Sequence, residues 1–231
     1  HTRLRTVTGV QTCALPILPW CLAKCPYCDF NSHARPAEGV PEARYLAALR
    51  ADLEAALPLV WGRPVVSVFI GGGTPSLFSP EAIDALLSGV RARLVLEPGA
   101  EVTLEANPGA VEAARFRGFR DAGVNRISIG VQSFDDAMLQ RLGRIHSASE
   151  ARRAIDAALA AFDNVNVDLM YGLPGQEIGG AEADIRQAAG CAVPHISAYQ
   201  LTIEPNTVFF SRPPALPEHD ACADMQAMIE Q

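Results

Sequence analysis

The sequence lacks the long apolar runs, the positive charge and the cysteine density that characterise several common classes of protein. No stretch reaches the roughly 18 apolar residues of a membrane span, so we expect no integral membrane segment. With 19 Lys and Arg against 26 Asp and Glu, the net charge of −7 gives no electrostatic basis for binding nucleic acid. No basic segment followed by an apolar stretch indicates a secretion signal, and we expect a cytoplasmic protein.

Cysteine is too sparse for a disulfide scaffold, with six residues in a chain of 231. Three of the six, Cys21, Cys25 and Cys28, nevertheless crowd into one short segment. In a chain with no sign of secretion, such crowding indicates metal binding in a reducing compartment. The remaining composition, 49% apolar and 19% charged, is typical of a globular protein with one large domain.

The N-terminal segment does not read as ordinary protein sequence. Val7 to Ile17 (VTGVQTCALPI) looks like the in-frame translation of a common sequencing-adapter oligonucleotide. We therefore interpret residues 1–17 as an adapter-derived artefact and exclude them from the predicted fold, the alternative being an ordinary N-terminal arm. The predicted organisation then has a main domain over 18–210 and the start of a truncated C-terminal region over 211–231.

Beyond residue 40 the sequence alternates between helical and strand patterns. Apolar residues recur every three or four positions in the expected helices, and β-branched residues gather in the expected strands. Strands that alternate with helices predict parallel βαβ units and hence an α/β fold. We expect helices over 41–57, 80–94, 110–122, 135–142, 148–162 and 181–190, and strands over 64–70, 101–107, 126–132, 164–172 and 195–204.

Glycine-rich and polar motifs follow these strands at their carboxyl ends, where parallel α/β sheets place their chemistry. A run of glycines exposes backbone N–H and C=O groups to a ligand, although a tight turn is the alternative explanation. Side chains with hydrogen-bond acceptors lie on the later strands, and an arginine follows in a loop, which together could hold a polar ligand. Taken alone, one of the carboxylates could be a helix cap or part of a salt bridge, and the arginine could form a surface ion pair. The residues concerned are Gly71-Gly72-Gly73-Thr74-Pro75, Glu105, Gln132, Asp168 and Arg144.

The cysteine motif has the donor set of an iron–sulfur site. Three thiolates on one loop suit three corners of a [4Fe–4S] cluster, which leaves the fourth iron free to bind a small molecule. A zinc site is the alternative, because zinc takes four ligands and His33 is near enough in sequence to supply the last one. Inert thiols are the third interpretation. The motif reads Cys21-Leu22-Ala23-Lys24-Cys25-Pro26-Tyr27-Cys28.

The C-x3-C-x2-C spacing, with an aromatic residue before the last cysteine, resembles the motif of the radical S-adenosylmethionine (SAM) family. The resemblance implies a partial (β/α)6 barrel whose [4Fe–4S] cluster is held by Cys21, Cys25 and Cys28. It also implies that SAM chelates the open iron and is cleaved by one electron to a 5′-deoxyadenosyl radical, chemistry that belongs to the cofactor. By the same resemblance, Arg144 would pair with the SAM carboxylate, and further SAM contacts would come from Tyr27, Gly72, Gly73, Thr74, Glu105, Gln132 and Asp168.

Longer strings resemble the haem chaperone branch of that family, which is related to oxygen-independent coproporphyrinogen III oxidase. The oxidase has a fourth cysteine two residues after the third, where this chain has Phe30. The resemblance implies a protein that binds haem and delivers it to respiratory haem proteins. Oxidative decarboxylation of a porphyrinogen and a zinc-stabilised, non-enzymatic binding module stay open, as does whether the chain is an enzyme. The strings are LPWCLAKCPYCDFNSH, FIGGGTPSLF, TLEANPG, RISIGVQSF, LGRIHS, VDLMYGLPGQ and YQLTIEPNT.

Two departures from the family pattern lie at the ends of the chain. Family members carry a first barrel strand before the cysteines, where this chain has the adapter-like string. They also continue into a C-terminal domain, in which the haem-binding motif is expected. We therefore expect a fragment that lacks both, with one edge of its sheet unpaired.

Overall fold

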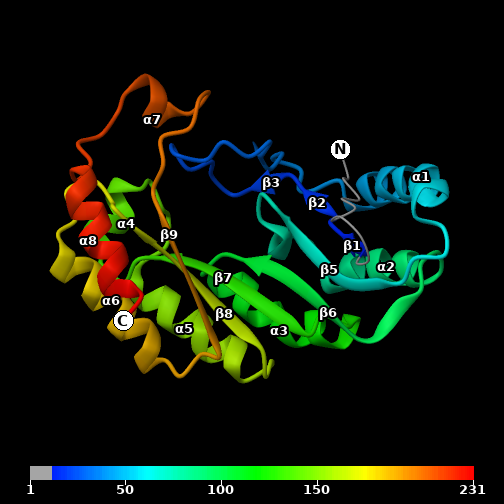
Figure 1. The fold of residues 1–231 in the computed structure, drawn as a ribbon. Coiled ribbons are helices and arrows are strands. Elements are labelled where there is room, and N and C mark those ends of the chain that lie inside the picture. The colour runs from blue at the N-terminus through cyan, green and yellow to red at the C-terminus, as the bar shows by residue number, and fades with distance from the viewer. Residues whose placement is uncertain (1–11) are drawn as a thin grey trace.

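A computed structural model describes residues 12–231 of the chain (Figure 1). Its centre is a curved, parallel sheet with the strand order β1-β5-β6-β7-β8-β9, and β2 also pairs with β5. A separate two-stranded sheet joins β3 and β4. The strands are β1 (Thr12–Ala14), β2 (Ile17–Leu18), β3 (Trp20–Cys21), β4 (His33–Ala34), β5 (Val65–Gly72), β6 (Leu96–Ala106), β7 (Arg126–Gln132), β8 (Val165–Tyr171) and β9 (His195–Gln200).

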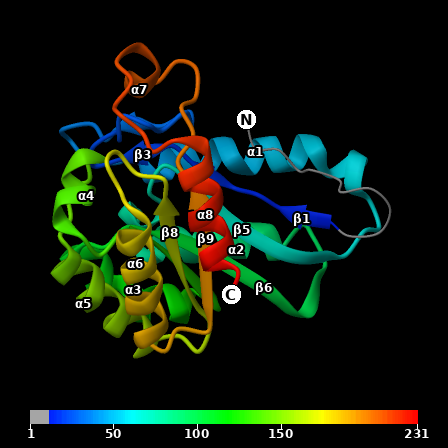
Figure 2. The ribbon, with the colours of Figure 1, turned by 60° about the vertical axis from the view of Figure 1, so that its left-hand side comes forward.

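Helices connect the strands and cover the convex side of the sheet, while the segment with the cysteines lies across its opposite side (Figures 1 and 2). The predicted α/β half-barrel is thus confirmed, and each of the six expected helices is present. The helices are α1 (Glu42–Val60), a 3-10 turn (Pro75–Leu77), α2 (Pro80–Arg91), α3 (Ala110–Ala122), α4 (Asp136–Arg141), α5 (Ala148–Leu159), α6 (Ile178–Gly190), α7 (Val208–Ser211) and α8 (His219–Ile229).

Local sequence signals fix where several helices begin and end. The Ser79 hydroxyl accepts a hydrogen bond from the amide of Ala82 and caps α2, and a reciprocal capping box between Ser147 and Glu150 begins α5. Gly123 ends α3 at a φ of +102°, in the left-handed region that glycine adopts readily. Short loops with defined caps leave the strand ends in fixed positions.

Strand β7 shows how the sequence divides the two faces of the sheet. Ile127 and Ile129 are fully buried in the core between sheet and helices. The alternate residue Ser128 faces the concave side, because side chains alternate along a strand, and Gln132 at the end of β7 lines the same cavity. The convex face therefore stabilises the fold, and the concave face is left to polar side chains.

The N-terminal edge of the sheet differs from the sequence-based expectation of an unpaired edge. Strand β1 pairs with β5, and Ile17 and Leu18 pair with Gly71 and Gly72. The physical reason is that the alternating burial of residues 12–14 suits a strand, whose backbone groups satisfy those of β5. The prediction that the first strand is absent is therefore wrong for the described residues. Residues 7–11 of the adapter-like string lie outside them, and the string's origin stays a prediction.

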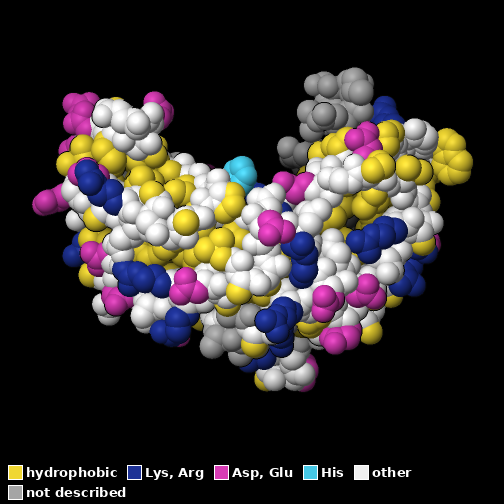
Figure 3. All heavy atoms as spheres, turned by 90° about the horizontal axis from the view of Figure 1, so that it is seen from below, with side chains coloured by type: hydrophobic (Ala, Val, Ile, Leu, Met, Phe, Trp, Pro, Cys, Tyr) yellow, Lys and Arg dark blue, Asp and Glu magenta, His cyan; other side chains and the backbone are white. Residues whose placement is uncertain are grey.

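The C-terminal residues expected to begin a truncated region form α8, which contacts α6. Met225 is buried with Tyr171 and Ala181, so this helix packs against α6 and the end of strand β8. Seen from below, the molecule has a broad notch between its two ends, and charged side chains of both signs are scattered over its surface (Figure 3). Over residues 12–231, every helix is too short or too polar to cross a bilayer.

Candidate functional site

The cysteine loop runs between β3 and β4, which pair Trp20 with His33 and Cys21 with Ala34. Inside the loop, the Cys28 amide donates to the Cys25 carbonyl at 3.2 Å, a turn that places the last two cysteines together. All three cysteines are free thiols, and burial raises the pKa of Cys21. The loop thus presents three sulfurs from a segment with little regular structure.

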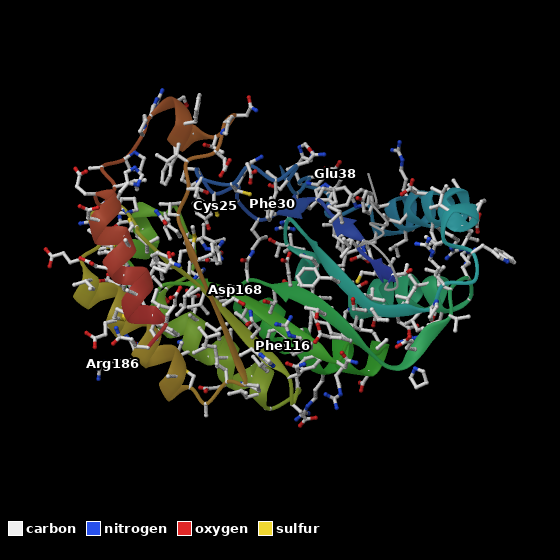
Figure 4. The ribbon with its side chains drawn as sticks, in the orientation of Figure 1. Cys25, Phe30, Glu38, Phe116, Asp168 and Arg186 are labelled. Carbon is white, nitrogen blue, oxygen red and sulfur yellow. The ribbon has the colours of Figure 1, made fainter. Side chains whose placement is uncertain are left out.

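One cavity of about 430 Å³ lies between this loop and the carboxyl ends of the strands. Figure 4 shows Cys25 and Phe30 on the loop, with Asp168 on the sheet facing them. The structure brings together every residue that the family resemblance assigns to the cluster or to SAM, since all of them line this cavity: Cys21, Cys25, Tyr27, Cys28, Gly72, Gly73, Thr74, Glu105, Gln132, Arg144 and Asp168. What these residues bind stays a prediction.

Two glycines of the GGGTP segment are required by close backbone contacts. Gly72 has a φ of +120°, and its amide donates to Glu105 Oε2 at 3.0 Å. A Cβ on Gly73 would lie 2.7 Å from the carbonyl oxygen of Trp20, closer than side-chain atoms approach. Any larger residue would therefore push the glycine segment away from the residues that lead into the cysteine loop.

Two carboxyl groups line the cavity from strands β6 and β8, which flank β7. Burial raises the pKa of Glu105 to about 7, the Gly72 amide opposes that rise, and the charge of Asp168 adds to it. Burial also raises the pKa of Asp168, against the hydrogen bonds that Ser128 and Asn166 donate at 2.8 Å. Both carboxyl groups would be ionised more readily beside a cationic ligand.

Arg144 is a buried cation at the same cavity. Its Nη2 donates to Asn107 Oδ1 at 2.6 Å and to the Gly130 carbonyl at 2.8 Å, while its Nη1 lies 3.5 Å from Cys25 Sγ. Among the described residues, its buried Nε has no hydrogen-bond partner and no carboxylate forms a salt bridge with it. A buried guanidinium without a counter-ion favours an anionic ligand group or cysteine thiolates beside it.

Sequence reasoning missed two polar residues of the site. Asn107 donates to Thr74 Oγ1 at 2.7 Å and accepts from Arg144, and Tyr199 donates to Gln132 Oε1 at 2.6 Å. Asn107 directly follows strand β6, and this position was the available signal. Tyr199 stands one residue before the end of its strand, in a string that carried no assigned role.

The histidines near the site do not complete a metal centre. His33 is exposed on β4, and His146 Nε2 contacts the carbonyl of Val131 at 3.1 Å. Burial lowers the pKa of His146 to about 4, with the charge of Arg144 adding to the effect, so this ring is neutral near pH 7.

The number of ligands bears on the choice between a cluster and a zinc ion. Within residues 12–231, no three His, Cys, Asp or Glu side chains converge closely enough to hold one metal ion. Zinc–sulfur bonds of about 2.3 Å would require sulfurs about 4 Å apart. A structural zinc site takes four protein ligands, whereas three cysteines suit a [4Fe–4S] cluster whose fourth iron has no protein ligand; which of the two this loop holds stays a prediction.

The lining of the cavity also fits SAM. Arg144 suits the carboxylate of an amino acid, and Glu105 and Asp168 suit an ammonium or sugar hydroxyls. A Cβ on Gly71 would lie 2.9 Å from Glu105 Oε2, and one on Gly130 would lie 2.9 Å from Gln132 Nε2. Glycine at these two positions keeps room for the polar groups that would hold the ligand.

The chain matches one protein family and is similar to curated proteins of bacteria and mammals. The family described as the radical SAM superfamily matches residues 15–188. Heme chaperone HemW of Escherichia coli (strain K12) is 56% identical over 209 residues, which cover 90% of this chain and 55% of that protein. Radical S-adenosyl methionine domain-containing protein 1, mitochondrial, of Bos taurus is 43% identical over 206 residues, covering 88% and 46% respectively.

The fold has a counterpart among solved structures. Coproporphyrinogen III oxidase (HemN) from Escherichia coli, a radical SAM enzyme, superposes with a TM-score of 0.81 at 25% identity, covering 94% of this chain and 51% of that one. The chain spans about half the length of the curated relatives it matches. Family match and sheet architecture agree with the resemblance found in the sequence, and the chain belongs to the radical SAM superfamily.

Proposed function

We propose that this protein holds a [4Fe–4S] cluster and SAM and acts in haem metabolism as a haem chaperone. One observation carries the cofactor part of the proposal: the three cysteines, the buried Arg144 and the acceptors of the strand ends line a single cavity. The relatives named heme chaperone HemW, at 56% and 53% identity, support the haem part.

Each group of residues has a separate task in this proposal. Cys21, Cys25 and Cys28 ligate three irons and leave the fourth open. Arg144 holds the SAM carboxylate in a charge-assisted contact, because its guanidinium has no carboxylate partner among the described residues. When bound, the cluster supplies the single electron for reductive chemistry on SAM.

The remaining residues orient SAM rather than react with it. The segment Gly72–Thr74 brings backbone groups to the methionine end, and Tyr27 covers the cluster beside Cys25. Glu105, Gln132 and Asp168 share the ammonium and the ribose hydroxyls. The cavity would then hold SAM between a covalently fixed cluster and a hydrogen-bonding sheet end.

The haem partners belong to the proposal as well. We infer that the protein is cytoplasmic, binds haem or a related porphyrin, and passes it to respiratory haem proteins. The names of the similar proteins support the haem ligand, and the free cysteines of the described chain suit a reducing compartment.

A second candidate is oxidative decarboxylation of coproporphyrinogen III. The similarity to coproporphyrinogen III oxidase (HemN), with a TM-score of 0.81, favours it. The cysteine motif favours the chaperone instead, because Phe30 stands where the oxidase resemblance expects a fourth cysteine.

Anaerobic reconstitution of the protein tests both candidates. We expect about four irons per chain with a visible thiolate-to-iron absorption band. Haem should titrate to a defined stoichiometry and transfer to an apo-haem protein, while coproporphyrinogen III, SAM and a reductant should give no decarboxylated product. Turnover of the porphyrinogen would establish the second candidate, and the absence of iron would contradict both.

A further inference from the structure

The end of strand β7 carries a backbone conformation that its sequence does not favour. Gln132 has a φ of +70°, in the left-handed region that costs a side-chain-bearing residue about 1 kcal/mol or more. The register between β7 and β8 also shifts between Gly130 and Gln132. A bulge of this kind redirects a side chain, and here it brings the Gln132 amide into the cavity.

Tyr199 reaches this amide from β9, two strands away on the same face of the sheet. It stands on β9 opposite Met170 of β8, and its hydroxyl donates to Gln132 Oε1 at 2.6 Å. Since β8 lies between the two strands, which are then roughly 10 Å apart, or twice the strand spacing, the Tyr199 and Gln132 side chains bridge this separation together. Desolvation raises the pKa of Tyr199 and the charge of Asp168 adds to the rise, so the hydroxyl keeps the proton that it donates.

In this structure the contact from Tyr199 engages the oxygen end of the Gln132 amide. With Oε1 occupied by the phenol, the Nε2 group is the end that lies beside Gly130, where a Cβ would be 2.9 Å away. Among the described residues, the Gln132 side chain forms one hydrogen bond, and that bond is made by Oε1. Gln132 is therefore presented to the cavity as a donor.

We propose that Tyr199 is a positioning residue that fixes the Gln132 amide with its nitrogen toward the ligand. The group that Gln132 meets must then be an acceptor, such as a ribose hydroxyl oxygen or a carboxylate oxygen of SAM. This inference rests on the proposed function, because it takes SAM as the ligand.

The test compares Y199F with Y171F in reconstituted protein under anaerobic conditions. Tyr199→Phe removes the hydroxyl and keeps the ring, whereas Tyr171→Phe makes the same change on the neighbouring strand, where the side chain packs beside α8. We expect Y199F to weaken SAM binding about fivefold by calorimetry, the effect of one lost hydrogen bond. Y171F should match the wild type, and both variants should keep the iron content.

A double-mutant cycle distinguishes positioning from direct contact. Because Tyr199 acts through Gln132, Tyr199→Phe should change SAM affinity less than twofold in a Q132A background. The response of the reduced cluster's EPR spectrum to SAM should follow the same pattern. An equal loss in both backgrounds, or unchanged affinity in Y199F, would overturn the inference alone; a wild-type protein that holds iron but binds no SAM would overturn the proposed function with it.

Discussion

The two walls of the cavity are built by different forces. The strand ends rest on a core in which Leu104 and Ile129 are fully buried, and each inner strand has hydrogen-bonded neighbours on both sides. The cysteine loop has only short paired segments at its base, and Leu22 and Phe30 on it are 44% and 57% exposed. The sheet therefore fixes the groups that line the cavity, whereas the sulfurs of the loop would be fixed mainly by the proposed cluster once it is bound.

Contacts between the two walls are both apolar and polar, and the Tyr27 ring packs against the buried apolar cluster that contains Met170 and Phe209. The amide of Phe209 donates to the Pro26 carbonyl at 3.0 Å, and Arg144 contacts Cys25 Sγ. On the other flank, the Thr74 amide donates to the Trp20 carbonyl at 2.7 Å. Substitutions in the loop should therefore remove the proposed cluster without unfolding the sheet. Substitutions at the carboxyl ends of the strands should lower the affinity for SAM by different amounts.

The largest effect should follow loss of one cluster ligand. In C25A the iron content should fall from about four to below about one per chain, because a two-cysteine loop cannot hold three corners of the cluster. Far-ultraviolet circular dichroism should be unchanged, since Cys25 lies outside the core. C191A, a change to another partly exposed free cysteine, should keep full iron. A C25A protein that retains a full cluster would show that the loop does not carry the ligands.

A smaller loss should follow removal of the buried cation. In R144M, SAM affinity should fall about 10- to 100-fold, because the charge-assisted contact to the carboxylate is lost. Calorimetry on the reconstituted protein measures this, with iron content checked in parallel. R141M is the matched control, since Arg141 donates to the Pro174 carbonyl outside the cavity. Equal affinity in R144M and the wild type would exclude the carboxylate contact.

The affinity for SAM should depend on pH through the ionisation of Glu105. Because its pKa is raised to about 7, about nine in ten of these carboxyl groups are protonated at pH 6 and about one in ten at pH 8. A cationic ligand favours the ionised form, so affinity for SAM should rise about tenfold as the pH increases from 6 to 8. E105Q should lose this component of the pH dependence, and identical profiles for the two proteins would contradict the assignment.

The same shift predicts a stability trend for the protein without ligand. The folded state keeps the Glu105 proton that the unfolded chain loses near its ordinary pKa of 4.5. The contribution of this group to stability is therefore present at low pH and is lost as the pH rises toward about 7. Denaturant melts of wild type and E105Q should diverge in that window.

The smallest effect concerns the N-terminal edge. The Tyr45 hydroxyl donates to the Ile17 carbonyl at 2.6 Å, which ties β2 to α1. Y45F should lower the free energy of unfolding by about 1 kcal/mol, because one hydrogen bond is lost. Iron content should not change. A melt of Y45F indistinguishable from that of the wild type would show that residues around Ile17 add no stability to the sheet.

The sequence allowed much of this site to be predicted, because its signals are local. The three cysteines stand in one short motif, and Glu105 and Gln132 stand at the ends of patterned strands, so topology alone brings them together. Tyr199 could not be predicted, since its partner Gln132 is distant in sequence, whereas the position of Asn107 directly after β6 was a signal that sequence reasoning missed. The edge strand cannot be predicted for a different reason, because the adapter interpretation excludes the string that contains Thr12 to Ile17 from the fold.

The most direct test of the shared cavity is Mössbauer spectroscopy on protein reconstituted with iron-57, before and after SAM is added. Three cysteine ligands leave one iron without a protein ligand, so SAM should shift the signal of one iron in four and leave the other three unchanged. A spectrum in which SAM alters no iron, or all four alike, would contradict the claim that loop and strand ends together form one cofactor site.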